Sequence, residues 1–252
     1  KIGDHPSQGK MNLLEVKNLV KRYGQRIVLD HITLRVNQKE IVGLLGPNGA
    51  GKTTAFSTII GLARQESGQV WLNSEELTPW PVYLRVRKGL GFLPQESSIF
   101  CGLTVEENLL LAAEARNGRQ GAGRCREMIH QQLEEFGLLP LVSQLAGQLS
   151  GGERRKLEIV RAMILEPQFL LLDEPFSELD PRSVTELQEV IMRLKEKGVG
   201  LLLTDHRARE ALKILDKIYI INEGKILFEG RPEEVLKENE IRKIYFGLDF
   251  RL

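Results

Sequence analysis

A glycine-rich segment that ends in a lysine and two threonines separates an apolar run from a helix-forming run. It fits the pattern G-x-x-x-x-G-K-[ST], whose glycines let the backbone curl around an anion and whose free amides point at a β-phosphate. Lys52 would place a cation on the β- and γ-phosphates, and the Thr53 hydroxyl is a suitable Mg²⁺ ligand. A structural turn is the alternative, but the strand–loop–helix context favours a nucleotide site. The predicted phosphate-binding residues are Gly46, Pro47, Asn48, Gly49, Ala50, Gly51, Lys52, Thr53 and Thr54.

An acidic pair follows a second apolar run, Phe169–Leu172. Asp173 would emerge at the carboxyl end of a buried strand, where open α/β sheets bind their ligands, and it suits a Mg²⁺ ligand. Glu174 points differently and is the candidate general base that polarises the attacking water. A solvated strand end is the alternative, and it suits a lone acidic pair better than one that accompanies a phosphate loop.

Two further polar residues follow predicted strands and complete the expected hydrolytic centre. His206 comes after the run Val199–Thr204 and is expected to hydrogen-bond the γ-phosphate and hold the water with Glu174. Gln95 comes after Leu90–Leu93, where a neutral amide can ligate Mg²⁺ or the water and still release it. The other histidines, His5, His31 and His130, have no comparable setting.

The segment Leu149-Ser-Gly-Gly-Glu153 predicts a second anion-binding corner. It opens a helix, so its amides and the helix dipole point outward at Ser150, Gly151, Gly152 and Glu153. If the two corners lie on different lobes, one nucleotide cannot touch both within one compact chain. The economical arrangement is a twofold dimer, in which each chain's corner caps the γ-phosphate that the other chain holds.

Strand-like and helix-like runs alternate around these motifs, which indicates a mostly parallel sheet with helices on its faces. An almost entirely helical block, from Val105 to Leu165, interrupts the alternation and indicates a second lobe. The predicted strands are Leu13–Leu19, Ile27–Val36, Glu40–Leu45, Gln69–Asn73, Leu90–Leu93, Phe169–Leu172, Val199–Thr204, Ile218–Asn222 and Ile226–Glu229. The predicted helices span about 52–61, 105–117, 124–137 and 151–166.

Composition sets the broad class of the protein. The 252 residues carry 35 lysines and arginines against 34 aspartates and glutamates, a formal net charge of +1 that gives no bulk attraction to nucleic acid or anionic membranes. No apolar run approaches the roughly 18 residues of a membrane span. Two cysteines are too few for a disulfide framework, so an intracellular protein is expected. Residues 1–10 are interpreted as a tag or flexible extension.

This ordered set of motifs resembles the nucleotide-binding subunit of ABC transporters, over Leu13 to Leu252. The resemblance implies ATP and Mg²⁺ as cofactors, with Thr53, Gln95 and Asp173 at the metal. It implies an α/β fold of the P-loop NTPase class, with a RecA-like core, an antiparallel β subdomain and an α-helical subdomain inserted at about 97–165 of a single domain, 11–252. It also assigns Tyr23 to stacking on adenine, a contact worth about 1–3 kcal/mol.

A closer resemblance, to the ATPase subunits of lipopolysaccharide-export transporters, lies in Phe92–Phe100, Asp173–Phe176, Thr204–His206 and Tyr245–Leu252. It implies a homodimer on the cytoplasmic face of the inner membrane, working with separate integral membrane subunits that dock near Phe100. Lipopolysaccharide would be the cargo, without direct contact, and no nucleic acid is expected.

Two positions depart from the pattern of these families. Cys101 and Gly102 stand where the resembling proteins tend to carry a basic residue, which leaves the electrostatic half of the docking contact open. The loop Ser177–Asp180 resembles the one that carries contacts between the two sites of the dimer, but Glu178 replaces the commoner alanine or glycine.

Other functions share some of these motifs. The ATPase subunits of branched-chain amino-acid importers are similar, and the Asp249–Leu252 ending favours lipopolysaccharide export over them. Soluble ABC proteins that act on ribosomes or DNA usually carry two cassettes or long coiled-coil insertions, which this chain lacks. A small-molecule kinase would not need Leu149–Glu153.

Overall fold

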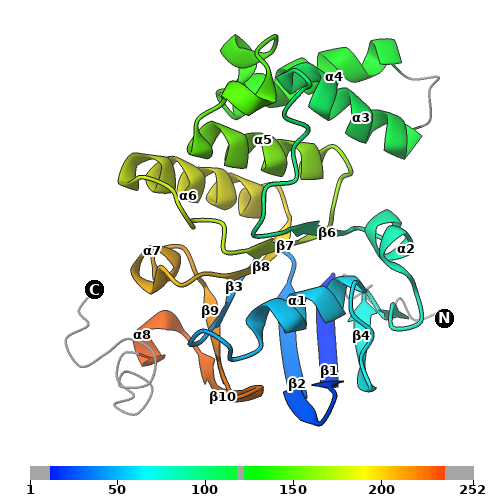
Figure 1. The fold of residues 1–252 in the computed structure, drawn as a ribbon, viewed down its shortest axis with the longest axis vertical. Coiled ribbons are helices and arrows are strands. Elements are labelled where there is room, and N and C mark those ends of the chain that lie inside the picture. Colours follow the sequence, from blue (N-terminus) through cyan, green and yellow to red (C-terminus); the bar gives the residue numbers. More distant parts are fainter. Residues whose placement is uncertain (1–11, 118–121, 236–252) are drawn as a thin grey trace, which may run out of the picture.

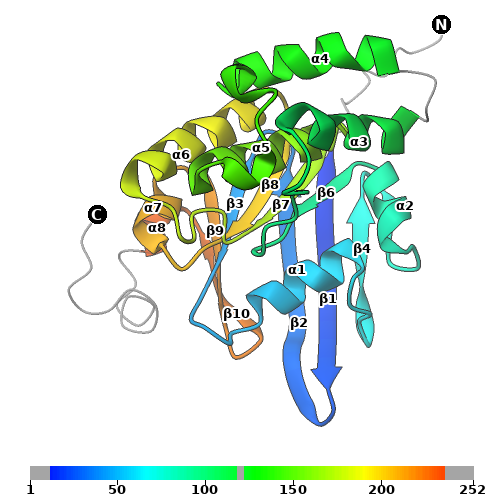
Figure 2. The same ribbon diagram turned by 45° about the horizontal axis from the view of Figure 1, so that its top comes forward.

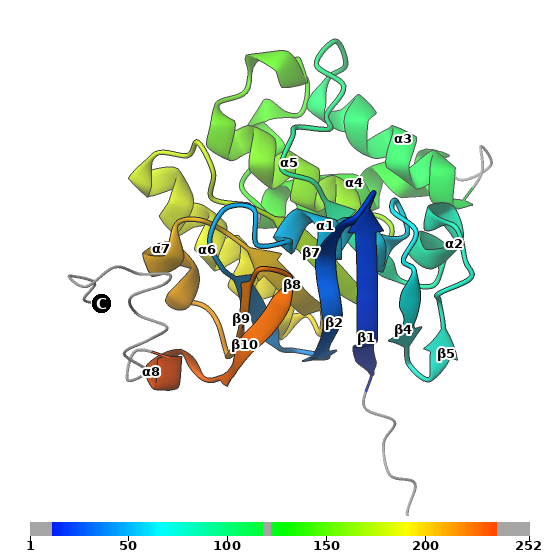
Figure 3. The same cartoon turned by 60° about the horizontal axis from the view of Figure 1, so that its bottom comes forward.

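The computed structural model describes residues 12–117 and 122–235, so the expected extension 1–10 and the Tyr245–Leu252 ending lie outside the described residues. Two sheets form the lower part of the molecule in Figure 1. The smaller sheet is antiparallel, with strand order β2-β1-β4-β5, and Figure 3 shows it from below. Its strands are β1 (Leu13–Tyr23), β2 (Arg26–Asn37), β4 (Ser67–Leu72) and β5 (Glu75–Glu76).

The larger sheet has six strands in the order β10-β9-β3-β8-β7-β6. All neighbours pair in parallel except β9 and β10, so the prediction of a mostly parallel sheet is confirmed. Every residue of β3, β7 and β8 is buried, as expected of strands with covered faces. The bounds are β3 (Ile41–Leu45), β6 (Leu90–Leu93), β7 (Phe169–Asp173), β8 (Gly200–Thr204), β9 (Lys217–Asn222) and β10 (Lys225–Gly230).

Alternating side chains of β3 enter two different apolar cores. Val42 and Leu44 join a core with α1 and the antiparallel sheet, whereas Ile41 and Leu45 join a core with the helices on the opposite face. Figure 2 shows α1 on one side of these strands and α5 and α6 on the other. The helices are α1 (Lys52–Ile60), α2 (Val82–Arg87), α3 (Val105–Asn117), α4 (Ala122–Glu135), α5 (Gly151–Met163), α6 (Pro181–Glu196), α7 (Ala208–Leu212) and α8 (Pro232–Val235), with 3-10 turns η2 (Leu139–Leu141) and η3 (Ala146–Gln148).

The helical block separates from the sheets as the sequence indicated. Helices α3, α4 and α5 lie together at the top of Figure 1, and the apolar stripe of α5, which includes Leu157 and Val160, is buried. Both α4 and α5 end earlier than predicted, at Glu135 and Met163. No helix of the described segments is long and apolar enough to cross a membrane.

Helix α2 was not predicted, and a long-range contact joins it to α1. Arg85 of this helix is buried, and its guanidinium donates to the backbone carbonyls of Thr58 and Ile59 at 3.1 and 2.6 Å. These carbonyls belong to the last turn of α1, where helices leave carbonyl groups without intrahelical partners. One side chain therefore caps α1 and fixes α2.

Candidate nucleotide site

The phosphate loop connects β3 to α1, as the motif predicts. Gly51 precedes α1 with φ +112°, and a Cβ there would lie 2.7 Å from the carbonyl oxygen of Val28. A Cβ on Gly46 would lie 2.0 Å from the carbonyl oxygen of Ile221. Gly49, with φ +78°, has no heavy atom within 4 Å of such a Cβ. Gly46 and Gly51 thus allow close packing, whereas Gly49 keeps the outer side of the loop open.

Lys52 is folded back into the loop that it follows. Its ammonium group donates to the carbonyl oxygens of Gly46 and Pro47 at 2.8 and 2.9 Å, and the side chain is buried. Burial lowers the pKa of Lys52, while the carboxylates of Glu174, Asp173 and Asp205 act to raise it. A phosphate group at this position would offer the ammonium stronger acceptors than the carbonyls it now uses.

Asp173 lies at the carboxyl end of β7 with 1% of its surface exposed. Its Oδ1 has no hydrogen-bond partner among the described residues. Burial, reinforced by the charge of Glu174, raises the pKa of Asp173 to about 6, against a hydrogen bond from Thr53 and the charge of Lys52. A buried carboxylate oxygen without a partner beside a threonine hydroxyl suits a hard divalent cation such as Mg²⁺.

Glu174 brings together the remaining residues predicted for hydrolysis. Its Oε2 accepts a hydrogen bond from Gln95 Nε2 at 3.0 Å and lies 3.1 Å from His206 Nδ1. The backbone of Glu174 adopts φ +48°, and its amide donates to the carbonyl oxygen of Thr204 at 2.8 Å. The ends of β6, β7 and β8 therefore converge on one carboxylate, in an arrangement able to hold a water molecule and accept its proton.

Tyr23 lines the same cavity as the phosphate loop. This cavity has a volume of about 360 Å³, and its walls include Asn48, Thr54 and Glu174. The tyrosine ring is 55% exposed, and Lys21 Nζ lies 4.8 Å from its centroid. An exposed aromatic face beside a phosphate loop is suited to base stacking. The stacking role itself stays a prediction.

The second predicted corner lies at the start of α5, away from this cavity. Ser150 and Glu153 form a reciprocal cap: Ser150 N and Oγ donate to Glu153 Oε2 at 2.8 and 2.7 Å. These hydrogen bonds lower the pKa of Glu153. Gly151 lines a cavity of about 440 Å³ with Gln95 and Glu178. This cavity shares Glu174 with the phosphate-loop cavity, but no residue of α5 lines the latter. Within one chain, the two corners do not meet.

Sequence reasoning missed a buried ion pair that joins α5 to this centre. Arg155 donates to Glu158 and to the backbone carbonyl of Pro94, both at 2.9 Å. The same guanidinium donates to the carbonyl oxygens of Asp173 and Glu174, at 3.0 and 3.3 Å. The signal was present in the sequence, because two opposite charges spaced i, i+3 flank Leu157 on the apolar stripe of α5.

Glu158 extends this ion pair to the segment after Gln95. It accepts hydrogen bonds from Ser97 Oγ at 2.7 Å and Ser98 N at 2.8 Å. The backbone on both sides of Gln95 is therefore tied to α5 by the Arg155–Glu158 pair.

An apolar groove surrounds Phe100. It has a volume of about 570 Å³ and is lined by residues of α2, β6, α3 and α5, among them Val86, Phe92 and Leu111. Phe100 is 54% exposed, and the guanidinium of Arg161 lies 5.8 Å from its ring centroid. Arg161 thus places a positive charge at the groove, although Cys101 does not.

Comparisons with known proteins show which family the chain resembles. A model of the ABC transporter family matches residues 29–177. The lipopolysaccharide export system ATP-binding protein LptB of Haemophilus influenzae is 44% identical over 242 residues, and that of Escherichia coli K12 is 41% identical. Each match covers 96% of this chain and 100% of the relative. A solved structure of an ATP-binding cassette of an ABC transporter, in its ADP conformation, has a TM-score of 0.84 at 28% identity, covering 94% of this chain and 99% of the other.

Proposed function

The chain belongs to the ABC transporter family and is an ATP-hydrolysing transport subunit, and from that premise we propose that it powers the extraction of lipopolysaccharide from the inner membrane towards the outer membrane. The observation that carries this cargo assignment is the similarity to lipopolysaccharide-export ATP-binding proteins over their whole length. The chain would act on the cytoplasmic face of the inner membrane as a peripheral subunit.

In the proposed reaction, the residues of the nucleotide site divide binding from hydrolysis. Lys52 leaves its loop carbonyls for the β- and γ-phosphates, and Tyr23 stacks on the adenine. Glu174 takes the proton of the attacking water, while His206 and Gln95, which already contact its carboxylate, hold its orientation.

Thr53, Asp173 and Gln95 would hold Mg²⁺, which neutralises charge on the phosphates when bound. The partnerless Oδ1 of Asp173 supports this assignment. Because the pKa of Asp173 is about 6, its carboxylate is mostly ionised above neutral pH and is then available to a cation.

The proposed catalytic unit is a homodimer, in which the second copy supplies Ser150 to complete each site. A Cβ on Gly151 would meet only Leu179 Cδ2, at 3.4 Å, so packing of the described residues does not require glycine there. An open glycine at a helix N-terminus leaves room for a phosphate of the other chain to approach the amides. The separation of the two corners within one chain supports the same arrangement.

The groove at Phe100 is the proposed docking site for an integral membrane subunit. Contiguous apolar surface with an exposed aromatic is typical of protein interfaces. Arg161, beside the Phe100 ring, would provide the positive charge that Cys101 does not.

The test is to express the chain in cells depleted of their own lipopolysaccharide-export ATPase and to identify the membrane proteins that copurify with it. We expect restored delivery of lipopolysaccharide to the outer membrane, and copurification of the export subunits. Copurification of amino-acid importer subunits, or of ribosomes, without restored delivery would contradict the proposal.

A further inference from the structure

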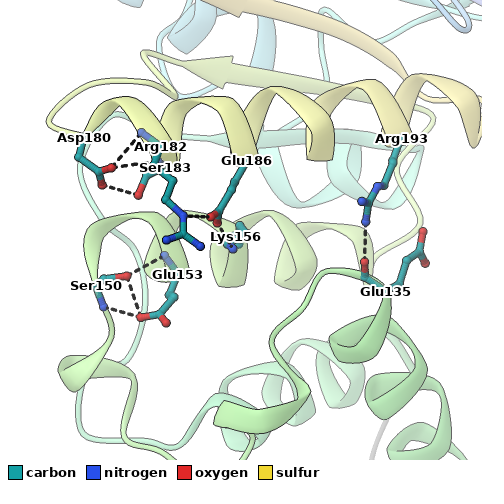
Figure 4. Close-up of polar contacts among 9 residues, drawn as sticks. All are labelled: Glu135, Ser150, Glu153, Lys156, Asp180, Arg182, Ser183, Glu186 and Arg193. Atoms are coloured by element: carbon teal, nitrogen blue, oxygen red, sulfur yellow. Dashed lines mark hydrogen bonds and ion pairs between the residues drawn. The ribbon is translucent and has the colours of Figure 1, made fainter.

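The start of α5 rests on the start of α6, and Figure 4 shows the polar contacts between these helices. Lys156 Nζ of α5 donates to Glu186 Oε2 of α6 at 2.8 Å. The Lys156 side chain is 13% exposed, so this bond lies partly away from water. Lys156 is also the first cause by which the pKa of Glu186 is lowered. The ion pair is therefore formed at neutral pH and links the helical block to the sheet-bearing part of the chain.

A second contact lies one turn away, at the tip of α5. A Cβ on Gly152 would lie 2.5 Å from Ser183 Oγ and 2.8 Å from Ser183 Cβ, so the two helices touch at this glycine. Ser183 in turn donates to Asp180, the residue that caps α6. The Ser150 corner thus packs against α6 at Gly152, and Lys156 links it to the same helix through Glu186.

The far end of α6 also binds the helical block. Arg193 donates to the backbone carbonyl of Glu135 at 2.7 Å, and Lys197 forms an ion pair with the Glu135 carboxylate. These contacts bind the end of α4, on the side away from Ser150. Nearer Ser150, Glu186 is the α6 carboxylate that binds α5, in addition to the hydrogen bonds that Arg155 makes to the strand ends.

We infer that Glu186 is a positioning residue for ATP-driven association of two chains. Through Lys156 it holds the Ser150 corner in the position where that corner contacts the γ-phosphate bound by the other copy. This rests on the proposed homodimer. Helix α6 begins at Pro181, seven residues after Glu174, so it follows the proposed hydrolytic carboxylate closely in the chain. Neither Glu186 nor Lys156 lines the phosphate-loop cavity, so loss of the Glu186 charge should act on the surface offered to the partner and leave that cavity unchanged.

The chain offers a matched control in Arg182. Its Nε donates to Glu186 Oε1 at 3.1 Å, but both residues lie on α6, and the Arg182 side chain is 89% exposed. Replacing Arg182 therefore removes a cation from the same carboxylate without touching the bond to α5.

The experiment measures ATP-dependent dimerisation of the full chain by light scattering after size exclusion, in a Glu174→Gln background that stops turnover. Glu186→Gln and Lys156→Met should each raise the ATP concentration for half-maximal dimer about fivefold or more, as expected for loss of a part-buried ion pair. Arg182→Gln should change it less than about twofold. The double variant Lys156→Met/Glu186→Gln should be no worse than either single variant, because both remove one interaction.

A fluorescent ATP analogue, bound to the chain below its dimerisation concentration, provides the second readout. Its affinity should stay within about twofold in every variant. The inference would be overturned if Glu186→Gln left the ATP concentration for half-maximal dimer unchanged, or raised it no more than Arg182→Gln does. This holds even if the melting temperature of Glu186→Gln falls. A Lys156→Arg variant that retains the parent midpoint would support the inference. A Glu174→Gln parent that binds the analogue but never dimerises would overturn the proposed homodimer, and the inference with it.

Discussion

Arg155 donates a hydrogen bond from its guanidinium to the backbone carbonyl of Asp173 at 3.0 Å, which joins α5 to the end of β7. The same side chain reaches Pro94 and Glu174, so one buried cation contacts the backbone beside both Gln95 and the proposed base. The start of α5 also carries the corner that we propose for the partner chain. Arg155 therefore connects the helix that bears this corner to the backbone beside the proposed base.

Arg155→Met should destabilise the fold by about 3–5 kcal/mol, because it leaves the Glu158 carboxylate buried without its cation. Urea unfolding followed by circular dichroism measures this change. Arg154→Met is the matched control, since Arg154 has one long hydrogen bond of 3.4 Å to the carbonyl of Leu149. Equal stability of the two variants would show that the buried pair has no special structural importance.

Asp173→Asn should stabilise the chain at pH 7.5 in the absence of nucleotide and Mg²⁺. The pKa of Asp173 is raised from 3.8 to about 6, so the folded state favours the neutral form. The stabilising contribution of the neutral Asp173 carboxyl group is fully present below pH 3.8 and is lost as the pH rises through 6. A pKa raised this far corresponds to about 3 kcal/mol of stability.

The control for this prediction is pH itself. Thermal unfolding of both proteins is measured at several pH values. The melting temperature of Asp173→Asn should exceed that of the parent at pH 7.5 and equal it near pH 4. A difference that does not depend on pH would contradict burial of the charge as its cause.

Glu178→Gly should be more stable than Glu178→Ala by about 1 kcal/mol. Glu178 has φ +60°, a left-handed conformation that costs residues with a Cβ roughly 1–2 kcal/mol and costs glycine almost nothing. The larger unfolded-state entropy of glycine offsets part of the gain. Chemical denaturation of both variants measures the difference, and an alanine variant as stable as the glycine variant would refute strain at this position.

Phe100→Ala should abolish copurification with the membrane subunits while leaving the chain folded. The side chain is 54% exposed, so its loss should change stability by less than about 1 kcal/mol. Tyr83→Ala is the control, because Tyr83 is 62% exposed and is not among the residues that line the groove. Equal retention of the membrane subunits by both variants would place the docking surface elsewhere.

Local motifs predicted that three residues of the proposed hydrolytic centre would lie together, because each follows a strand of the same sheet. Gln95, Glu174 and His206 follow β6, β7 and β8, and parallel strands bring their carboxyl ends to one edge. The contacts that support these residues are long-range and leave little trace in spacing. Arg155 of α5 reaches the segments at Pro94 and Asp173, and Arg85 of α2 binds carbonyls of α1.

The most direct test of the account is turnover in Glu174→Gln. The amide has nearly the shape of the carboxylate but cannot accept a proton from water, so ATP hydrolysis should fall at least about a hundredfold. ATP affinity should stay within about twofold, because Lys52 and the loop amides are untouched, and the chain should accumulate as an ATP-bound dimer. Turnover equal to that of the parent would contradict the assignment of Glu174 as the base.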